Sequence, residues 1–134
     1  MRVMALDPGS RRIGVAVSDE MGLLATRVTV VPRGSRASDL RALQALILQY
    51  RPETILVGYP LLPSGDAGPQ AGKSERFAEL LRSELSVPVR LWNESYSTVE
   101  AHRRRREARL RRRHQYIDAE AAAVLLQDYL DAQR

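Results

Sequence analysis

The chain has 134 residues, of which 44% are hydrophobic and 28% are charged, a composition typical of one folded domain over residues 1–134 and not of a disordered protein. No apolar run approaches the roughly 18 residues of a membrane span, and the first residues lack the features of a secretory signal. The absence of cysteine excludes disulfides, thiolate zinc sites and cysteine nucleophiles. We therefore expect a cytoplasmic protein with no membrane attachment.

The net charge of +5 is concentrated in one segment. Residues 102–114 read HRRRREARLRRRH and carry +7, so the rest of the chain carries −2. Arginine binds phosphate oxygens with two parallel hydrogen bonds. A solvated basic helix is one interpretation, and a surface that contacts nucleic acid is the one we favour. The arginines concerned are Arg103, Arg104, Arg105, Arg106, Arg109, Arg111, Arg112 and Arg113.

Three apolar segments near the start of the chain predict three strands: Arg2–Leu6, Ile13–Ser18 and Leu23–Val31. They follow one another too closely for helices between them, so we expect an antiparallel meander. In the second segment the small residues Gly14 and Ala16 alternate with branched ones. One face of this strand should therefore allow another element to approach closely.

The rest of the chain alternates between helical and strand patterns. In chain order we expect a helix from Ser38 to Tyr50, a strand at Thr54–Gly58, a long loop at Tyr59–Gly72, a helix at Ser74–Leu85, a strand at Val87–Trp92 and a last helix at Ile117–Ala132. The order βββαβαβα predicts an α/β fold with a five-stranded mixed sheet, three antiparallel strands followed by parallel crossovers, and helices on both faces. This is the ribonuclease H-like arrangement.

Three acidic residues occur where such a sheet gathers its chemistry. Asp7 follows the first strand, Glu94 follows the last strand, and Asp118 begins the last helix. Taken singly, each has a structural interpretation: a turn, a solvated carboxylate and a helix cap, respectively. Asp118, however, shares the apolar stripe of its helix. The other members of that stripe are Ala121, Ala122, Leu125 and Tyr129.

An acid on an inward stripe must be paired, neutral or bound to metal. If Asp7, Glu94 and Asp118 converge, their mutual repulsion requires cations, and hard oxygen ligands select Mg²⁺ or Mn²⁺. Two such ions, roughly 3.5–4 Å apart, would activate a water and stabilise the leaving oxygen of a phosphodiester. The acids and the basic segment therefore point to the same chemistry, metal-dependent cleavage of nucleic acid.

Four segments of the chain resemble a known family. They are MALDPGSRRIGVAVSD, VGYPLLPSGDAGPQAGKSERFAELL, LWNESYSTVEA and IDAEAAAVLLQDYL, which together span almost the whole chain in order. In these segments the sequence resembles the YqgF (RuvX) family, relatives of the RuvC Holliday-junction resolvases. The resemblance implies a ribonuclease H-like fold and a nuclease, a hydrolase acting on ester bonds, that processes the 5′ end of precursor 16S ribosomal RNA in ribosome biogenesis. Cleavage of branched DNA is the older proposal for the family.

By position, the acidic site residues of the family correspond to Asp7, Glu94 and Asp118. The family usually has Asp-Glu-Arg where this chain has Asn93-Glu94-Ser95, a difference that bears on metal affinity and rate. Lys73 lies where the family has a basic residue and could contact a phosphate. Asp19 and Asp66 also match acids of the family, and we assign both to turns.

Two other functions fit parts of the sequence. The segment at residues 7–10 also resembles the phosphate loop of actin-like and sugar-kinase ATPases, but such enzymes need two domains, and 134 residues supply one. A non-catalytic RNA-binding module with a ribonuclease H-like fold stays open, because Asn93 and Ser95 depart from the family pattern. The expected partner is structured or single-stranded RNA, or branched DNA, bound by a monomer or a homodimer.

Overall fold

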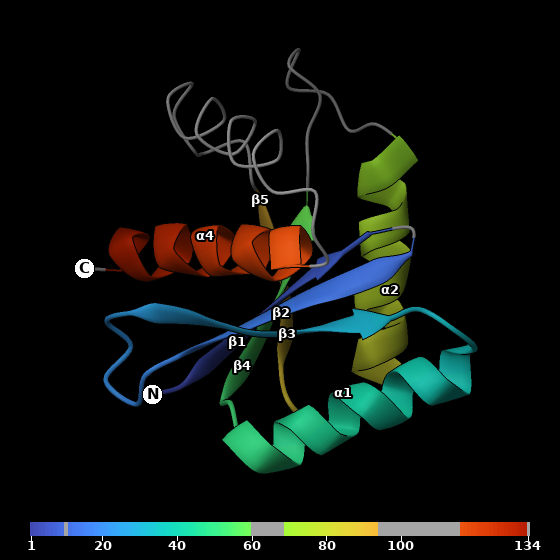
Figure 1. The fold of residues 1–134 in the computed structure, drawn as a ribbon, viewed down its shortest axis with the longest axis horizontal. Helices are drawn as coiled ribbons and strands as arrows, with labels where there is room; N and C mark the ends of the chain where they lie inside the picture. The colour runs from blue at the N-terminus through green and yellow to red at the C-terminus, as the bar shows by residue number, and fades with distance from the viewer. Residues whose placement is uncertain (10, 60–68, 94–115, 134) are drawn as a thin grey trace.

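A computed structural model describes residues 1–9, 11–59, 69–93 and 116–133 (Figure 1). The elements, in chain order, are β1 (Val3–Pro8), β2 (Arg12–Ser18), β3 (Ala25–Pro32), α1 (Arg36–Tyr50), β4 (Thr54–Tyr59), α2 (Pro69–Glu84), β5 (Val89–Asn93) and α4 (Tyr116–Ala132). The predicted order of strands and helices is confirmed. None of the described helices has the length and apolarity that crossing a bilayer requires.

The five strands form one sheet in the order β3-β2-β1-β4-β5. β2 pairs antiparallel with both β1 and β3, which confirms the predicted meander. β4 pairs parallel with both β1 and β5. The carboxyl ends of β1, β4 and β5 therefore lie at one edge of the sheet, together with the start of β2 and the end of β3.

Each face of the sheet packs against its own helices, as the fold class predicted (Figure 1). Met4 and Leu6 of β1 point into a core that includes residues of α1 and α2. Val3 and Ala5, which alternate with them, point into a second core formed with α4. Ala16 of β2 is fully buried in this second core, so the small residues do allow α4 to approach the sheet closely.

α1 and α2 begin two and five residues earlier than predicted. α1 begins at Arg36, not Ser38, because the hydroxyl of Ser35 accepts a hydrogen bond from the Ser38 backbone N–H and caps the helix. α2 begins at Pro69, not Ser74, so the expected loop over residues 59–72 is shorter. Proline fits the first position of a helix because no intrahelical partner exists there for a backbone N–H.

The last strand begins later than predicted, at Val89 instead of Val87. Pro88 lacks a backbone N–H to donate to the sheet, although its carbonyl oxygen accepts a hydrogen bond of 2.9 Å from the Ile55 N–H.

The turn role of Asp19 is confirmed. Its carboxylate accepts hydrogen bonds from the backbone N–H groups of Leu23 (2.7 Å) and Leu24 (3.3 Å), and the bond from Leu23 contributes most to lowering the pKa of Asp19. Asp66 lies outside the described residues.

α2 contains two serines in opposite situations, and they provide a test of the packing. Ser74 is 1% exposed, and its hydroxyl has no hydrogen-bond partner within the described part of the chain. An unsatisfied buried hydroxyl costs about 1–3 kcal/mol, and alanine is the better helix former by a few tenths of a kcal/mol. We expect Ser74→Ala to raise the free energy of unfolding in urea by about 1 kcal/mol.

Ser83→Ala in the same helix is the matched control. The exposed Ser83 hydroxyl donates a hydrogen bond of 2.8 Å to the Leu80 carbonyl oxygen, so its loss should nearly cancel the gain in helix propensity. A Ser74→Ala protein less stable than the Ser83→Ala protein would show that the Ser74 hydroxyl has a stabilising role.

Candidate active site

Asp7 lies at the carboxyl end of β1 and faces α4. It is the last residue but one of the strand. Because side chains alternate along a strand, Asp7 shares its face with Val3 and Ala5, which pack against α4. Its side chain is partly exposed, and its partner across the β1–β2 ladder is Gly14, which adds no side chain beside it. The carboxylate is therefore held on a rigid strand at the edge where the parallel strands end.

The direction of α4 brings its first turn toward this edge. Gln127, near its other end, donates a hydrogen bond of 3.0 Å to the Leu23 carbonyl oxygen and accepts one of 2.9 Å from the Ala25 N–H. Leu23 lies in the β2–β3 connection and Ala25 begins β3, at the end of β2 remote from Gly14. α4 thus starts on the side of the β1–β2 turn and ends on the side of the chain's N-terminus (Figure 1).

By its spacing in α4, residue 118 belongs to the stripe that is predicted to face the sheet. It precedes Ala121, Ala122 and Leu125 by three, four and seven positions, and these three side chains are buried. Tyr129, expected on the same stripe, makes an edge-to-face contact with Trp92 of β5, with ring centroids 5.1 Å apart. The inward stripe is confirmed for the residues that follow Asp118. That Asp118 meets Asp7 stays a prediction.

The third expected acid follows the strand beside β4. Asn93 ends β5 and pairs with Tyr59, the last residue of β4, while Leu6 of β1 pairs with Val57 of β4. β5 therefore ends at the same edge as β1. The expected site residues outside the described part of the chain are Glu94, Arg103, Arg104, Arg105, Arg106, Arg109, Arg111, Arg112 and Arg113.

The donor chemistry at this edge suits a hard divalent cation. Asp7 supplies carboxylate oxygens, which Mg²⁺ and Mn²⁺ prefer as ligands. Its partner on β2 is Gly14, so no side chain on that residue competes for the space beside the carboxylate. Among the side chains that the structure describes, no three acidic or histidine residues come together as a metal site. Glu94 and the side chain of Asp118, the other two expected ligands, lie outside what the structure describes.

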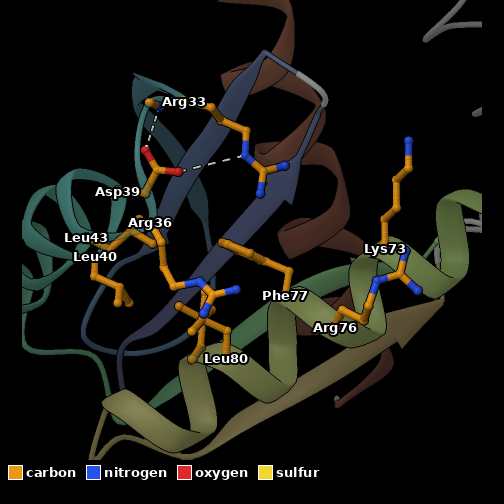
Figure 2. A pocket seen from close by; sticks show the side chains of 11 residues that line it. Arg33, Arg36, Asp39, Leu40, Leu43, Lys73, Arg76, Phe77 and Leu80 are labelled. Atoms are coloured by element: carbon orange, nitrogen blue, oxygen red, sulfur yellow. Dashed lines mark hydrogen bonds and ion pairs between the residues drawn. The ribbon is translucent and has the colours of Figure 1, made fainter.

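A second feature of this edge was not predicted from the sequence. Lys73, expected to contact nucleic acid, is exposed on α2 and lines a cavity of about 400 Å³ between α1 and α2. Arg33, Arg36 and Arg76 line the same cavity (Figure 2). These cations come from the end of β3, the start of α1 and the first half of α2, so no local sequence pattern connects them.

Comparison with known proteins places the chain among nucleases. A family model described as RuvX, Holliday junction resolvase, matches residues 1–132. A protein of Geobacillus kaustophilus (strain HTA426) named "Putative pre-16S rRNA nuclease" is 46% identical over 138 residues, with all of both chains covered. A protein of the same name from Clostridium novyi (strain NT) is 44% identical, covering 98% of this chain and 99% of the relative.

Solved structures support the ribonuclease H-like fold. RuvC of T. thermophilus in complex with a Holliday junction substrate superposes with a TM-score of 0.60 at 21% identity, covering 99% of this chain and 96% of the other. The fowlpox virus resolvase in complex with Holliday junction DNA gives a TM-score of 0.61 at 11% identity, covering 99% of each chain. At these identities the likeness concerns the fold.

Proposed function

The chain belongs to the RuvX family of nucleases, hydrolases that act on phosphodiester bonds, and from this premise we propose that it is a metal-dependent nuclease that processes the 5′ end of precursor 16S ribosomal RNA in the cytoplasm. The observation that carries the proposal is the placement of Asp7. Its carboxylate lies at the carboxyl edge of the sheet on the face of α4, toward which the first turn of α4, with residue 118, is directed.

In this mechanism Asp7, Glu94 and Asp118 hold two divalent ions, Mg²⁺ or Mn²⁺. When bound, the ions supply a nucleophile from water and stabilise charge on the leaving oxygen. Asp7 is held firmly, because a side chain on a paired β-strand is positioned more precisely than one on a loop. The segment Arg103–Arg113 holds the phosphate backbone beside the ions and gives affinity without sequence preference.

The names of the relatives favour ribosomal RNA as the substrate. Two of them, 46% and 44% identical, carry names that specify pre-16S rRNA. A branched DNA substrate is the second candidate, and the description of the family model as a Holliday junction resolvase supports it. Both candidates use the same hydrolysis at the same carboxylates, so they differ in the shape of the nucleic acid that is bound.

Incubation with a panel of labelled substrates tests the proposal. The panel contains an RNA with the 5′ extension of precursor 16S rRNA, a single-stranded RNA of the same length, a single-stranded DNA and a four-way DNA junction. We expect Mg²⁺ or Mn²⁺ to support cleavage of the precursor RNA and a chelator to abolish it. Tight binding of the RNA without cleavage in either metal would instead identify a non-catalytic RNA-binding module.

A further inference from the structure

The cavity between α1 and α2 has a wall of cations and a single acid. Arg33, Arg36, Lys73 and Arg76 line it together with Asp39. Figure 2 shows Arg33 and Arg36 reaching toward Phe77 and Leu80 from the β3–α1 side, with Lys73 and Arg76 on the α2 side. All four cations are exposed. Several cations around one small cavity repel one another, and a bound anion relieves that repulsion.

The one acid is already engaged. A carboxylate oxygen of Asp39 accepts a hydrogen bond of 2.9 Å from the Gly34 N–H, and the other lies 4.0 Å from Nε of Arg33. For Arg36, Lys73 and Arg76, no ion pair or hydrogen bond of the side chain is found within the described residues. Three cations of the cavity are thus available to a ligand.

Arg33 is fixed in place and links the cavity to the candidate active site. Its guanidinium donates a hydrogen bond of 2.7 Å to the carbonyl oxygen of Gly9 and lies 5.3 Å from the centroid of the Phe77 ring. The Arg33 backbone N–H also bonds to the carbonyl oxygen of Arg11 at 2.9 Å. Gly9 and Arg11 belong to the β1–β2 turn directly after Asp7, so the cavity lies at the same edge of the sheet.

The start of α1 adds further attraction for an anion. Gly34 and Arg36, which flank the helix cap Ser35, both line the cavity. α1 is 15 residues long, and its first turn carries partial positive charge, which Asp39 in the same turn partly offsets. The floor is apolar, formed by leucines of both helices and by Phe77, so the groups that can attract an anion are the cations of the wall and the start of α1.

We propose that this cavity binds a backbone phosphate of the substrate strand, away from the bond that is cleaved. This inference rests on the proposed function. The nucleic-acid strand held in the cavity is the same strand that passes around the edge of the β-sheet to reach Asp7. A phosphodiester fits because it is a compact anion that arginine holds with two hydrogen bonds. The contact would position RNA or DNA without reading sequence.

Binding of labelled single-stranded RNA and DNA, measured by fluorescence anisotropy in a chelator over a range of salt concentrations, tests this site without requiring cleavage. Each phosphate contact contributes about 0.7 to the slope of log affinity against log salt. Removing two contacts in the double variant Arg36→Ala/Arg76→Ala should lower the slope by about 1.4. A fourfold rise in salt would then weaken the wild-type complex roughly 7-fold more than the variant complex.

The double variant Arg41→Ala/Arg90→Ala is the matched control. It removes two exposed arginines that do not line the cavity, and its salt slope should equal that of the wild type. The variant Arg36→Lys/Arg76→Lys keeps the charges and should keep the slope while lowering affinity, because lysine lacks the bidentate geometry.

A slope for Arg36→Ala/Arg76→Ala equal to that of the control would overturn the inference. The inference would also be overturned if this variant had a lower salt slope than the control with polyglutamate but an equal slope with the oligonucleotides. That result would assign the cavity to an acidic protein segment. Failure of the proposed function is seen separately, as the absence of cleavage in Mg²⁺ or Mn²⁺. The salt slope is measured in a chelator and does not depend on cleavage.

Discussion

Asp7→Asn is expected to abolish nucleic-acid cleavage while the fold stays intact. The substitution removes a negatively charged oxygen ligand and leaves the volume of the side chain almost unchanged. If the ions supply several kcal/mol of charge stabilisation, a loss of about 4 kcal/mol lowers the rate on the order of 10³-fold. Because Asp7 is only partly buried at a strand end, the thermal unfolding midpoint should stay close to that of the wild type. Asp118→Asn should give the same result.

Asp19→Asn is the control for this prediction. Asp19 lies in the β2–β3 connection, at the other end of the sheet, where an asparagine oxygen can still accept the N–H bonds of Leu23 and Leu24. This variant should cleave at the wild-type rate. If Asp7→Asn retained a rate within about threefold of the wild type in saturating Mg²⁺ or Mn²⁺ (a barrier change below about 1 kcal/mol), the carboxylate would not be a metal ligand in the reaction.

Replacing Arg103, Arg104, Arg105 and Arg106 with alanine is expected to weaken binding to all nucleic-acid sequences alike. The segment around them carries +7 in a chain whose remainder carries −2, and it lies in the sequence between Glu94 and Asp118. If two to four of these arginines contact phosphates, the salt slope should fall by roughly 1.4–2.8 on single strands, or by roughly 1.8–3.6 on duplex DNA. Affinity measured across a series of salt concentrations gives this slope directly.

The variant with four lysines at the same positions controls for charge. It keeps the point charges that release counterions and should keep the slope of the wild type. Should the alanine variant retain both the slope and the affinity of the wild type, the arginine segment would be a solvated surface with no role in substrate binding.

The sequence predicted the fold well because its patterns are long and regular. The apolar segments of β1, β2 and β4 are buried on both faces of the sheet, and such continuous apolar runs identify central strands. The starts of helices were predicted less well. α1 is capped by Ser35, one of two nearby serines that could cap it, and the glycine at position 72 concealed the first turn of α2, which begins at Pro69.

The sequence predicted a site residue only where the position along a strand already determines where the residue lies in the fold. Asp7 ends the apolar run of β1, and the topology alone then places it at the carboxyl edge. The basic cavity could not be predicted this way, because Arg33, Arg36 and Arg76 come together only when α1 and α2 pack on the same face of the sheet. Lys73 was identified through a family resemblance, which gave no indication of its three neighbours.

The central claim is that Asp7, Glu94 and Asp118 share divalent metal, and a crystal structure of the protein grown with Mn²⁺ tests it most directly. Anomalous scattering locates manganese without assumptions about ligands. The account predicts manganese at about 2.1 Å from carboxylate oxygens of Asp7 and Asp118, with a second ion roughly 3.5–4 Å from the first. Manganese bound away from Asp7, or carboxylates of Asp7 and Asp118 on opposite faces of the sheet, would contradict it.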